Sequence, residues 1–365
     1  MKTKHSGARY SAIVGIGEKL SKLEKNSDDK YLRLNRGVPS ATNIDISEVI
    51  PLIDFNSPKI KIYPNNSGIA ELKSAINKSF FNNKIDTENI YVTAGGMNAL
   101  DLVFKTLDAS KIYIPEFYWG AYANLMKINK VESGTYFSFD ELNEFNQKDS
   151  AVIICDPNNP IGDKYDDDML LNLVKKLNEN NVTVIWDSPY RKLFYEEGDD
   201  FYAKLSEYEN VILVESFSKS IGLSGQRLGF IHSTNKEFNT EFNINLLYVT
   251  NGINAFAQIL VEKILTTPEG IRAAKNFRKV TISEMNKNIQ FLKKKGLIAE
   301  EFYKNSTPVG IFVVVNKSEE ELLENKIGSV GLSYFTKSNK DYANKFSRIC
   351  IAVPSSEFKT YFNKL

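Results

Sequence analysis

The chain of 365 residues has few of the residues and patterns that define several classes of protein. It contains two cysteines, two histidines and two tryptophans, and its 46 Lys and Arg residues nearly balance its 45 Asp and Glu residues. A near-neutral chain lacks the concentrated basic face that nucleic acids and membrane surfaces require, so we expect neither as a partner. No stretch reaches the roughly 18 apolar residues of a membrane span, and no signal-peptide core follows the basic N-terminus. We therefore expect a cytoplasmic protein.

The cysteines and histidines show no pattern of a metal site. Cys155 and Cys350 lie far apart, and His5 and His232 match no catalytic or metal-binding spacing. A disulfide between the cysteines stays open from spacing alone, but two free, buried thiols in a reducing compartment are the expected state. For both histidines we expect a surface or packing role, and we expect no metal.

Five short apolar segments alternate with amphipathic stretches from about residue 90. They span 90–93, 111–114, 151–155, 182–186 and 211–214. Such β-branched, continuously apolar segments are typical of parallel strands buried on both faces. Between two of them, 169–180 carries leucines and a valine at helical spacing. The alternation predicts an α/β fold with right-handed crossovers.

The length favours two domains, because single cores stop growing at about 250–300 residues. We expect a large domain over 45–265, and a smaller α+β domain that combines 266–365 with the N-terminal arm, 1–44. The second part is predicted to contain a long helix over 268–295 and strands over 310–315 and 348–353.

Polar sequence directly follows four of the five strands, where ligands bind in α/β sheets. Gly95 and Gly96 either form a plain turn or offer backbone N–H groups to an anion at a helix N-terminus. Asn159 lies in a turn-forming run and would offer an amide donor. Asp187 directly follows four apolar residues, so it needs a cationic partner, such as a protonated heterocyclic nitrogen or an arginine.

The run from 215 to 230 is the most informative of the four. Lys219 lies among small hydroxylated residues and glycines, and Arg227 follows eight residues later. A lysine in such a pocket can lose its proton and attack a carbonyl carbon. The serines and the arginine could bind a phosphate.

These motifs, in this order, resemble the class I/II aminotransferases, which are enzymes of fold type I that depend on pyridoxal 5'-phosphate (PLP). The resemblance runs from about Arg33 to Arg348 and rests on Ser216-Phe217-Ser218-Lys219 with Arg227, Pro157-Asn158-Asn159-Pro160-Ile161-Gly162, and Asp187-Ser188-Pro189-Tyr190. Ile161 replaces the usual threonine of the second motif. The resemblance implies a mostly parallel central sheet with helices on both faces and a smaller α+β domain.

The resemblance also implies a role for each motif residue. Lys219 would hold PLP as a Schiff base and shuttle a proton, and Asp187 would pair with the pyridine nitrogen. Asn159 and Tyr190 would bind the phenolate oxygen. The phosphate would be surrounded by Gly95, Gly96, Met97, Ser216, Ser218 and Arg227, with Met97 contributing through its backbone.

Two aromatic segments resemble further parts of the family's site. Within 115–122, Trp119 is the favoured residue to stack on the cofactor and Tyr118 the second choice, while an aromatic core cluster is the alternative. Tyr63 resembles the tyrosine that relatives lend to the phosphate of the neighbouring subunit. This resemblance implies a homodimer with composite sites.

Three residues resemble the family's substrate contacts. Arg348 resembles the arginine that clamps the substrate α-carboxylate, because its fixed fork matches a carboxylate. Gly37 matches a glycine that approaches the substrate closely, and Asn159 would also touch it. The chain departs from the family at 333–337, where a Pro-Gly turn is usual. That departure bears on the substrate pocket and leaves the cofactor site unchanged.

We therefore expect an aminotransferase that moves an amino group between an L-amino acid and a 2-oxo acid. A PLP-dependent decarboxylase, C–S lyase or oxidase is the alternative, because the same residues serve those reactions. A third hypothesis, a PLP fold used only as a binding or regulatory module, is disfavoured by the intact set Lys219, Asp187, Asn159, Tyr190 and Arg227.

Overall fold

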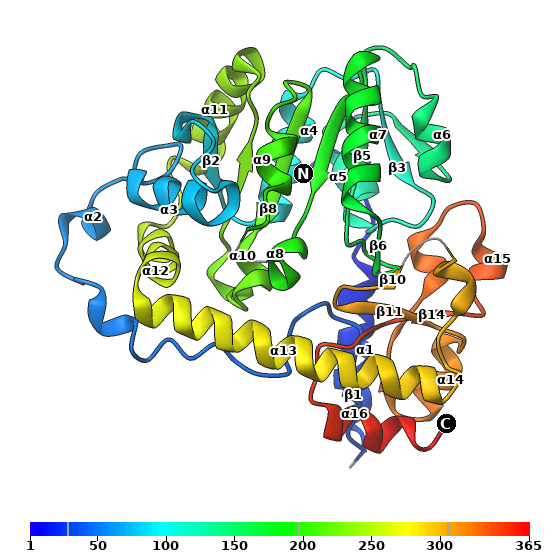
Figure 1. Cartoon of the computed structure of the whole chain (residues 1–365). Helices are drawn as coiled ribbons and strands as arrows, with labels where there is room; N and C mark the ends of the chain where they lie inside the picture. Colours follow the sequence, from blue (N-terminus) through cyan, green and yellow to red (C-terminus); the bar gives the residue numbers. More distant parts are fainter. Residues whose placement is uncertain (28, 196–197, 305–306) are drawn as a thin grey trace.

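The computed structural model describes residues 1–27, 29–195, 198–304 and 307–365 (Figure 1). Within these residues a central sheet is built from β2 (Ile90–Thr93), β3 (Lys111–Pro115), β4 (Ser133–Tyr136), β5 (Ser150–Ile154), β7 (Thr183–Asp187), β8 (Val211–Ser216) and β9 (Gly229–His232). Its order is β2-β9-β8-β7-β5-β3-β4, and β9 alone runs antiparallel to its neighbours. The mostly parallel sheet confirms the predicted α/β fold of type I.

The five predicted strands are all present, and the observed ends of each strand lie within two residues of the predicted ends. Every residue of β5 and β8 is buried, which explains their continuous apolarity. β4 was not predicted, because Ser133-Gly134-Thr135 carries no large hydrophobic side chain.

Helices cover both faces of this sheet, in two groups that contact within themselves. One group holds α4 (Gly96–Thr106), α5 (Ala121–Asn129) and α11 (Lys236–Thr250). The other, in front in Figure 1, holds α3 (Ala70–Phe81), α6 (Phe139–Asn143), α7 (Asp167–Glu179), α9 (Phe201–Leu205) and α12 (Ala255–Thr266). In α7 the predicted apolar stripe is buried, and the Asp166 side chain caps the helix by accepting from Met169 N.

A second hydrophobic cluster lies at the lower right of Figure 1. There β11 (Phe312–Val315), β14 (Ser347–Cys350) and β13 (Val330–Gly331) form an antiparallel sheet. Around it lie β1 (Leu32–Arg33), β12 (Ile327–Gly328), α1 (Ala12–Lys25), α14 (Glu319–Glu324), α15 (Lys340–Ala343) and α16 (Ser355–Phe362). The predicted long helix is confirmed as α13 (Pro268–Lys294), which runs along both clusters. The predicted strands 310–315 and 348–353 are shorter than expected, because pairing stops at Cys350.

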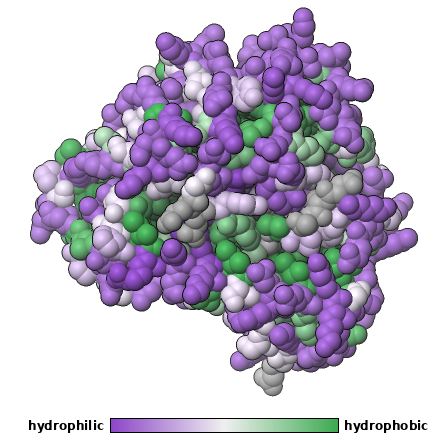
Figure 2. Space-filling view, in the orientation of Figure 1, coloured by the Kyte–Doolittle hydropathy of each residue, from purple (hydrophilic) through white to green (hydrophobic). Residues whose placement is uncertain are grey.

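The short elements α2 (Pro58–Lys61), α8 (Arg191–Phe194), α10 (Phe217–Ser220), β6 (Asp163–Lys164) and β10 (Thr307–Pro308) lie in the connections. Several connections at the strand ends of the central sheet pack into the second cluster, through Cys155, Ile161, Tyr190 and Leu193. Figure 2 shows a largely hydrophilic face with apolar residues gathered along the junction between the upper and lower parts. The strand ends therefore meet the second cluster at this junction.

Cys155 and Cys350 are both free and buried, as expected. His232 is buried against Phe81, with ring centroids 5.1 Å apart, and His5 is exposed. Among the described helices, none has the length and apolarity needed to cross a membrane.

Candidate active site

A cavity of about 340 Å³ lies where the strand ends meet the N-terminal segment and the sheet of the second cluster. Twelve residues that the sequence singled out line it: Gly37, Gly96, Met97, Trp119, Asn159, Asp187, Tyr190, Ser216, Ser218, Lys219, Arg227 and Arg348. They come from segments more than 300 residues apart, so only the fold brings them together. Gly95 lies just behind them, in contact range of Arg227.

Besides Gly95, two expected residues lie outside this cavity. Tyr63 is 82% exposed and touches no part of the cavity wall, so it does not serve the site of its own chain. Tyr118 is buried, and its backbone N–H donates to the Phe335 carbonyl at 2.9 Å. Of the two aromatic candidates, it is Trp119 that faces the cavity.

Asp187 ends β7 and is the only carboxylate in the cavity wall of the described chain. It is buried and accepts a hydrogen bond from the Tyr122 hydroxyl at 2.5 Å. Burial raises the pKa of Asp187 to about 6, although the Tyr122 hydrogen bond works against that rise. No described cationic side chain pairs with this carboxylate. Of the two partners that the sequence left open, the described chain supplies no arginine that pairs with Asp187.

Tyr122 is a site residue that sequence reasoning missed. It stands three residues after Trp119, at the spacing of neighbours on a helix, and the two rings meet edge to face at 5.7 Å between centroids. That spacing inside the aromatic run was the available signal. Burial raises the pKa of the Tyr122 phenol well above its usual value, so this group stays a proton donor.

Lys219 lies in α10, directly after β8. Burial lowers the pKa of its ammonium group to about 8, and repulsion from Arg227 and Arg348 lowers it further, while Cys350 opposes the shift. The Lys219 amine donates to the Gly37 carbonyl. A lysine pKa near 8 leaves an appreciable neutral fraction near pH 7, which is what nucleophilic attack on an aldehyde requires.

An anion cradle is built at the start of α4. Gly95 has φ +85°, which favours glycine, and a Cβ there would lie 2.9 Å from Arg227 Nη2, so the guanidinium packs closely against the start of α4. Ser216 and Ser218 face the same place, with their hydroxyl oxygens 3.0 Å apart. Backbone N–H groups at a helix start, two hydroxyls and a guanidinium fit a phosphate.

Arg348 in β14 is almost fully buried and has no carboxylate partner in the described chain. Its Nη1 donates to Asn159 Oδ1 at 3.1 Å, its Nη2 donates to the Asn35 carbonyl, and its guanidinium lies 4.1 Å from the Phe312 ring centroid. Its Nε has no hydrogen-bond partner among the described atoms. Burial lowers the pKa of Arg348 to about 10. A buried cation with a free donor fits a carboxylate ligand.

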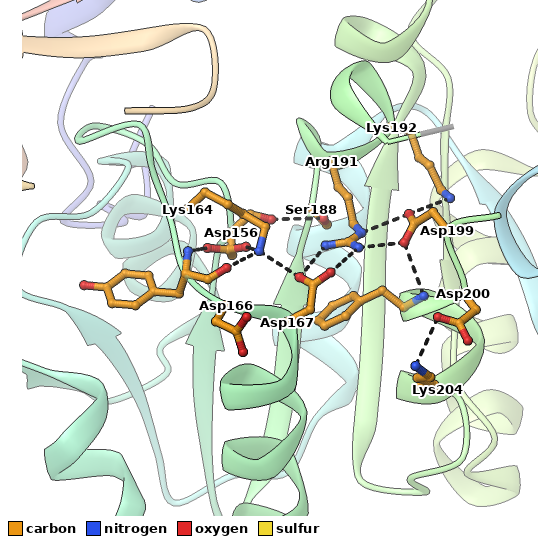
Figure 3. A network of polar contacts seen from close by, with 12 residues as sticks. Asp156, Lys164, Asp166, Asp167, Ser188, Arg191, Lys192, Asp199, Asp200 and Lys204 are labelled. Atoms are coloured by element: carbon orange, nitrogen blue, oxygen red, sulfur yellow. Dashed lines mark hydrogen bonds and ion pairs between the residues drawn. The ribbon is translucent and has the colours of Figure 1, made fainter. Parts of the chain in front are cut away.

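Beside the cavity lies a chain of buried ion pairs that the sequence did not reveal (Figure 3). Lys164 pairs with Asp156 at 3.1 Å and with Asp167 at 2.7 Å. Arg191 contacts both oxygens of Asp167 and both oxygens of Asp199, at 2.6 to 3.0 Å. Lys192 pairs with Asp199 at 2.9 Å.

This ion network holds two cavity residues in place. Asp156 opens the loop that carries Asn159, and Arg191 directly follows Tyr190. Burial alone would raise the pKa of Asp199, but the Arg191 hydrogen bonds and the charge of Lys192 lower it to about 2. The network therefore ties the two loops to α7, and Asp199 stays ionised within it.

Taken together, the cavity fits PLP: an uncompensated buried carboxylate for the ring nitrogen, a lysine of lowered pKa, and an anion cradle for the phosphate. The mostly parallel sheet and this set of residues fit the class of PLP-dependent enzymes of fold type I. The chain belongs to the aminotransferase class I and II family, whose sequence model matches residues 31–365. It is therefore a PLP-dependent aminotransferase.

Comparisons with individual proteins agree with this family assignment. The chain is 26% identical to a histidinol-phosphate aminotransferase of Brachyspira hyodysenteriae, over 81% of this chain and 87% of that protein. It is 25% identical to a probable aspartate aminotransferase of Methanocaldococcus jannaschii, over 86% and 92%. Among solved structures, aspartate aminotransferase from Thermus thermophilus with maleate superimposes with a TM-score of 0.85 at 19% identity, over 100% of this chain and 99% of that one. This last likeness concerns the fold.

Proposed function

We propose that the chain moves an amino group between an L-amino acid and a 2-oxo acid, with Lys219 as the group that holds PLP and moves the proton. The observation that carries this proposal is the pair of buried charges, Asp187 and Arg348, that lack counter-charges in the described chain. One fits the cationic ring of the cofactor, and the other fits the carboxylate of an amino acid. When bound, PLP supplies an aldehyde that receives the amino group and a ring that withdraws electrons from the substrate Cα.

Each residue then has a defined task. Asp187 would hold a proton on the pyridine nitrogen, and Tyr122 would fix the carboxylate by its hydrogen bond. Lys219 would bind the aldehyde carbon through its amine and, once displaced by substrate, would carry a proton between the substrate Cα and C4' of the cofactor. The lowered pKa of Lys219 supports both tasks, since each needs a neutral amine.

Asn159 would link the two ligands. Its Oδ1 accepts from Arg348, so its Nδ2 is left to donate to the phenolate oxygen. Tyr190 would donate to the same oxygen, because burial raises the pKa of its phenol well above the usual value and keeps it protonated. Arg348 would clamp the α-carboxylate, with Gly37 beside it.

The remaining cofactor contacts follow from the cavity wall. Trp119 would stack on the ring. The phosphate would be held by Gly95, Gly96, Met97, Ser216, Ser218 and Arg227, the first three through backbone N–H groups.

Quaternary structure, domains and compartment are also proposals. The exposed Tyr63 supports a homodimer in which it reaches the phosphate of the neighbouring site. The two hydrophobic clusters support a large domain over 45–265 and a small domain over 1–44 and 266–365. The two free cysteines support a reducing, cytoplasmic location.

The test is the visible absorption spectrum of the PLP-loaded protein with a panel of L-amino acids. An aminotransferase loses its yellow absorbance when its amino donor is added alone, and regains it when a 2-oxo acid follows. A decarboxylase or C–S lyase would release product and keep its yellow absorbance, and that outcome would overturn the proposal.

A further inference from the structure

The parallel ladder between β7 and β8 stops at the edge of the cofactor cavity, the cavity of about 340 Å³ that fits PLP. In the described chain its last backbone hydrogen bond runs from Ser188 N to the Val214 carbonyl at 2.9 Å. A regular parallel ladder would continue with Ser216 N donating to the Ser188 carbonyl. Here Ser216 N donates instead to Glu215 Oε1 at 2.8 Å. The backbone pairing therefore ends where Asp187 and Ser216 line the cavity.

Two buried side chains take up the backbone groups that the ladder would have joined. The Tyr202 hydroxyl lies 2.6 Å from Glu215 Oε2 and 3.2 Å from the Ser188 carbonyl oxygen. Hydrogen bonds thus run from Ser216 N through the Glu215 carboxyl group and the Tyr202 hydroxyl to Ser188, which directly follows Asp187. Both side chains are fully buried. This Glu215–Tyr202 bridge satisfies both backbone groups and sets the gap between the two strand ends.

The protons of the bridge give every group in it a partner. Burial raises the pKa of Glu215 to about 8 and the Asp187 charge adds to the rise, while the hydrogen bonds to the carboxyl oxygens and the Lys192 charge oppose it. Burial also raises the pKa of Tyr202 well above its usual value. Both groups are therefore mostly protonated at neutral pH. Glu215 can then donate to Tyr202 Oη, while Tyr202 donates to the Ser188 carbonyl.

Packing holds the Tyr202 ring in place. The ring stacks on Phe80 with centroids 6.4 Å apart, and its centroid lies 6.0 Å from that of Phe81. Lys192 Nζ lies 5.2 Å from the same ring and pairs with Asp199 at 2.9 Å. None of these residues lines the cofactor cavity. The bridge is therefore anchored to α3 and to the ion network, and a bridge anchored in this way resists changes in the gap.

We propose that Glu215 and Tyr202 are positioning residues for the cofactor, because their bridge sets the spacing between Asp187 and Ser216. This inference rests on the proposed function, in which Asp187 binds the ring nitrogen and Ser216 binds the phosphate. The ring nitrogen and the phosphate belong to one small molecule, so both contacts form together only where the protein holds their partners at a matching distance. Glu215 and Tyr202 themselves touch neither cofactor nor substrate.

Three probes without an aldehyde test the spacing in the cofactor-free protein. Pyridoxine 5'-phosphate reaches both contacts, whereas pyridoxine reaches only the ring contact and inorganic phosphate only the phosphate cradle. In Tyr202→Phe we expect displacement calorimetry to show about tenfold weaker binding of pyridoxine 5'-phosphate, with the other two probes changed by less than about twofold. Native affinity for pyridoxine 5'-phosphate, or an equal loss of affinity for all three probes, would overturn the inference.

Tyr136→Phe is the matched control. The buried Tyr136 hydroxyl also donates to a backbone carbonyl of the central sheet, that of Ile153 in β5, at 2.9 Å, and Tyr136 does not line the cofactor cavity. Both phenylalanine variants lose one buried hydrogen bond, so both should unfold at lower urea concentrations than the native protein. Only Tyr202→Phe should bind pyridoxine 5'-phosphate more weakly. Equal affinities in the two variants would mean that Tyr202 only stabilises the fold, which contradicts the proposal.

Glutamate variants test the other half of the bridge. Glu215→Leu removes the partner of Ser216 N and should bind pyridoxine 5'-phosphate about tenfold more weakly. Glu215→Gln should regain most of that affinity, because the amide oxygen can accept from Ser216 N and the amide N–H can donate to Tyr202 Oη. Binding by Glu215→Gln as weak as that by Glu215→Leu would count against the bridge.

Two further variants separate this inference from the proposed function. Asp187→Asn and Ser216→Ala remove the contacts that the bridge is proposed to position, and each should weaken the binding of pyridoxine 5'-phosphate. If both keep the native affinity, the proposed cofactor contacts fail and the present inference fails with them. If both bind the probe more weakly and Tyr202→Phe does not, only the present inference fails.

Discussion

Two groups of buried charges lie side by side in this molecule and differ in their partners. Among the charges of Figure 3, Asp156, Lys164, Asp167, Arg191, Lys192 and Asp199 each have a counter-charge within 3.1 Å. In the cofactor cavity, Asp187, Lys219 and Arg348 have none among the described residues. Burying an unpaired charge costs several kcal/mol, so a fold keeps such groups where a ligand completes them. The comparison separates charges that position loops from charges that bind ligands.

Asp156 and Asp187 show the difference most closely. They stand at the ends of neighbouring strands, β5 and β7, and burial raises the pKa of each to about 6. Lys164 pairs with Asp156 and opposes its shift, whereas Asp187 has only the Tyr122 hydroxyl. The free aspartate is the one that faces the cavity.

The largest expected effect is on turnover, in Lys219→Ala. Without the amine there is no group to move the Cα proton, so the rate of amino transfer should fall by about a thousandfold or more. PLP should still bind through the phosphate cradle and Asp187. Stopped-flow loss of the yellow absorbance with the best amino donor measures the rate, and a native rate in this variant would disprove the role of Lys219.

Asp187→Asn removes a ligand-binding charge and should act mainly on chemistry. An amide cannot hold the proton on the ring nitrogen, so kcat should fall by about a hundredfold or more. The folded protein loses no ion pair, so its free energy of unfolding without cofactor should not fall below the native value at neutral pH. An unchanged kcat would show that Asp187 does not serve the cofactor.

Asp199→Asn removes a positioning charge and should act mainly on stability. Arg191 and Lys192 would lose a buried partner, which costs about 3 kcal/mol in the free energy of unfolding. Urea unfolding of the cofactor-free protein measures the loss. A variant as stable as the native chain would show that the network contributes little.

The smallest effect is a pH dependence of opposite sign for these two aspartates. Between about pH 4 and pH 6, Asp187 stays protonated in the folded protein, whereas the same residue in the unfolded chain has lost its proton. The stability that this group contributes at low pH is therefore lost as the pH rises through about 6. Asp199, with its pKa near 2, contributes stability above about pH 4 that is lost as pH falls towards 2.

Urea unfolding of cofactor-free protein at pH 4.5 and 7.5 tests the first sign. From the lower to the higher pH, the stability of Asp187→Asn relative to the native chain should rise by about 2 kcal/mol. A constant difference would mean that Asp187 titrates normally in the fold.

The sequence predicted the features that depend on residues close together in the chain. The strands follow from runs of apolar residues, and Lys219 with Arg227 follows from one short motif at a strand end. The ion network escaped prediction because Asp156 and Arg191 lie 35 positions apart and show no periodic spacing. The contact of Tyr122 with Asp187 needed the packing of α5 against the end of β7.

Gly37 allows the Phe312 ring to approach the backbone closely, because glycine has no side chain. A Cβ at this position would lie 2.2 Å from Phe312 Cζ, and the Phe312 ring in turn supports the Arg348 guanidinium at 4.1 Å. The carbonyl of Gly37 also accepts from the Lys219 amine. The backbone at Gly37 thus helps to set the spacing between the Lys219 amine and the Arg348 guanidinium. These two groups would bind the α-amino and α-carboxylate groups of an amino acid.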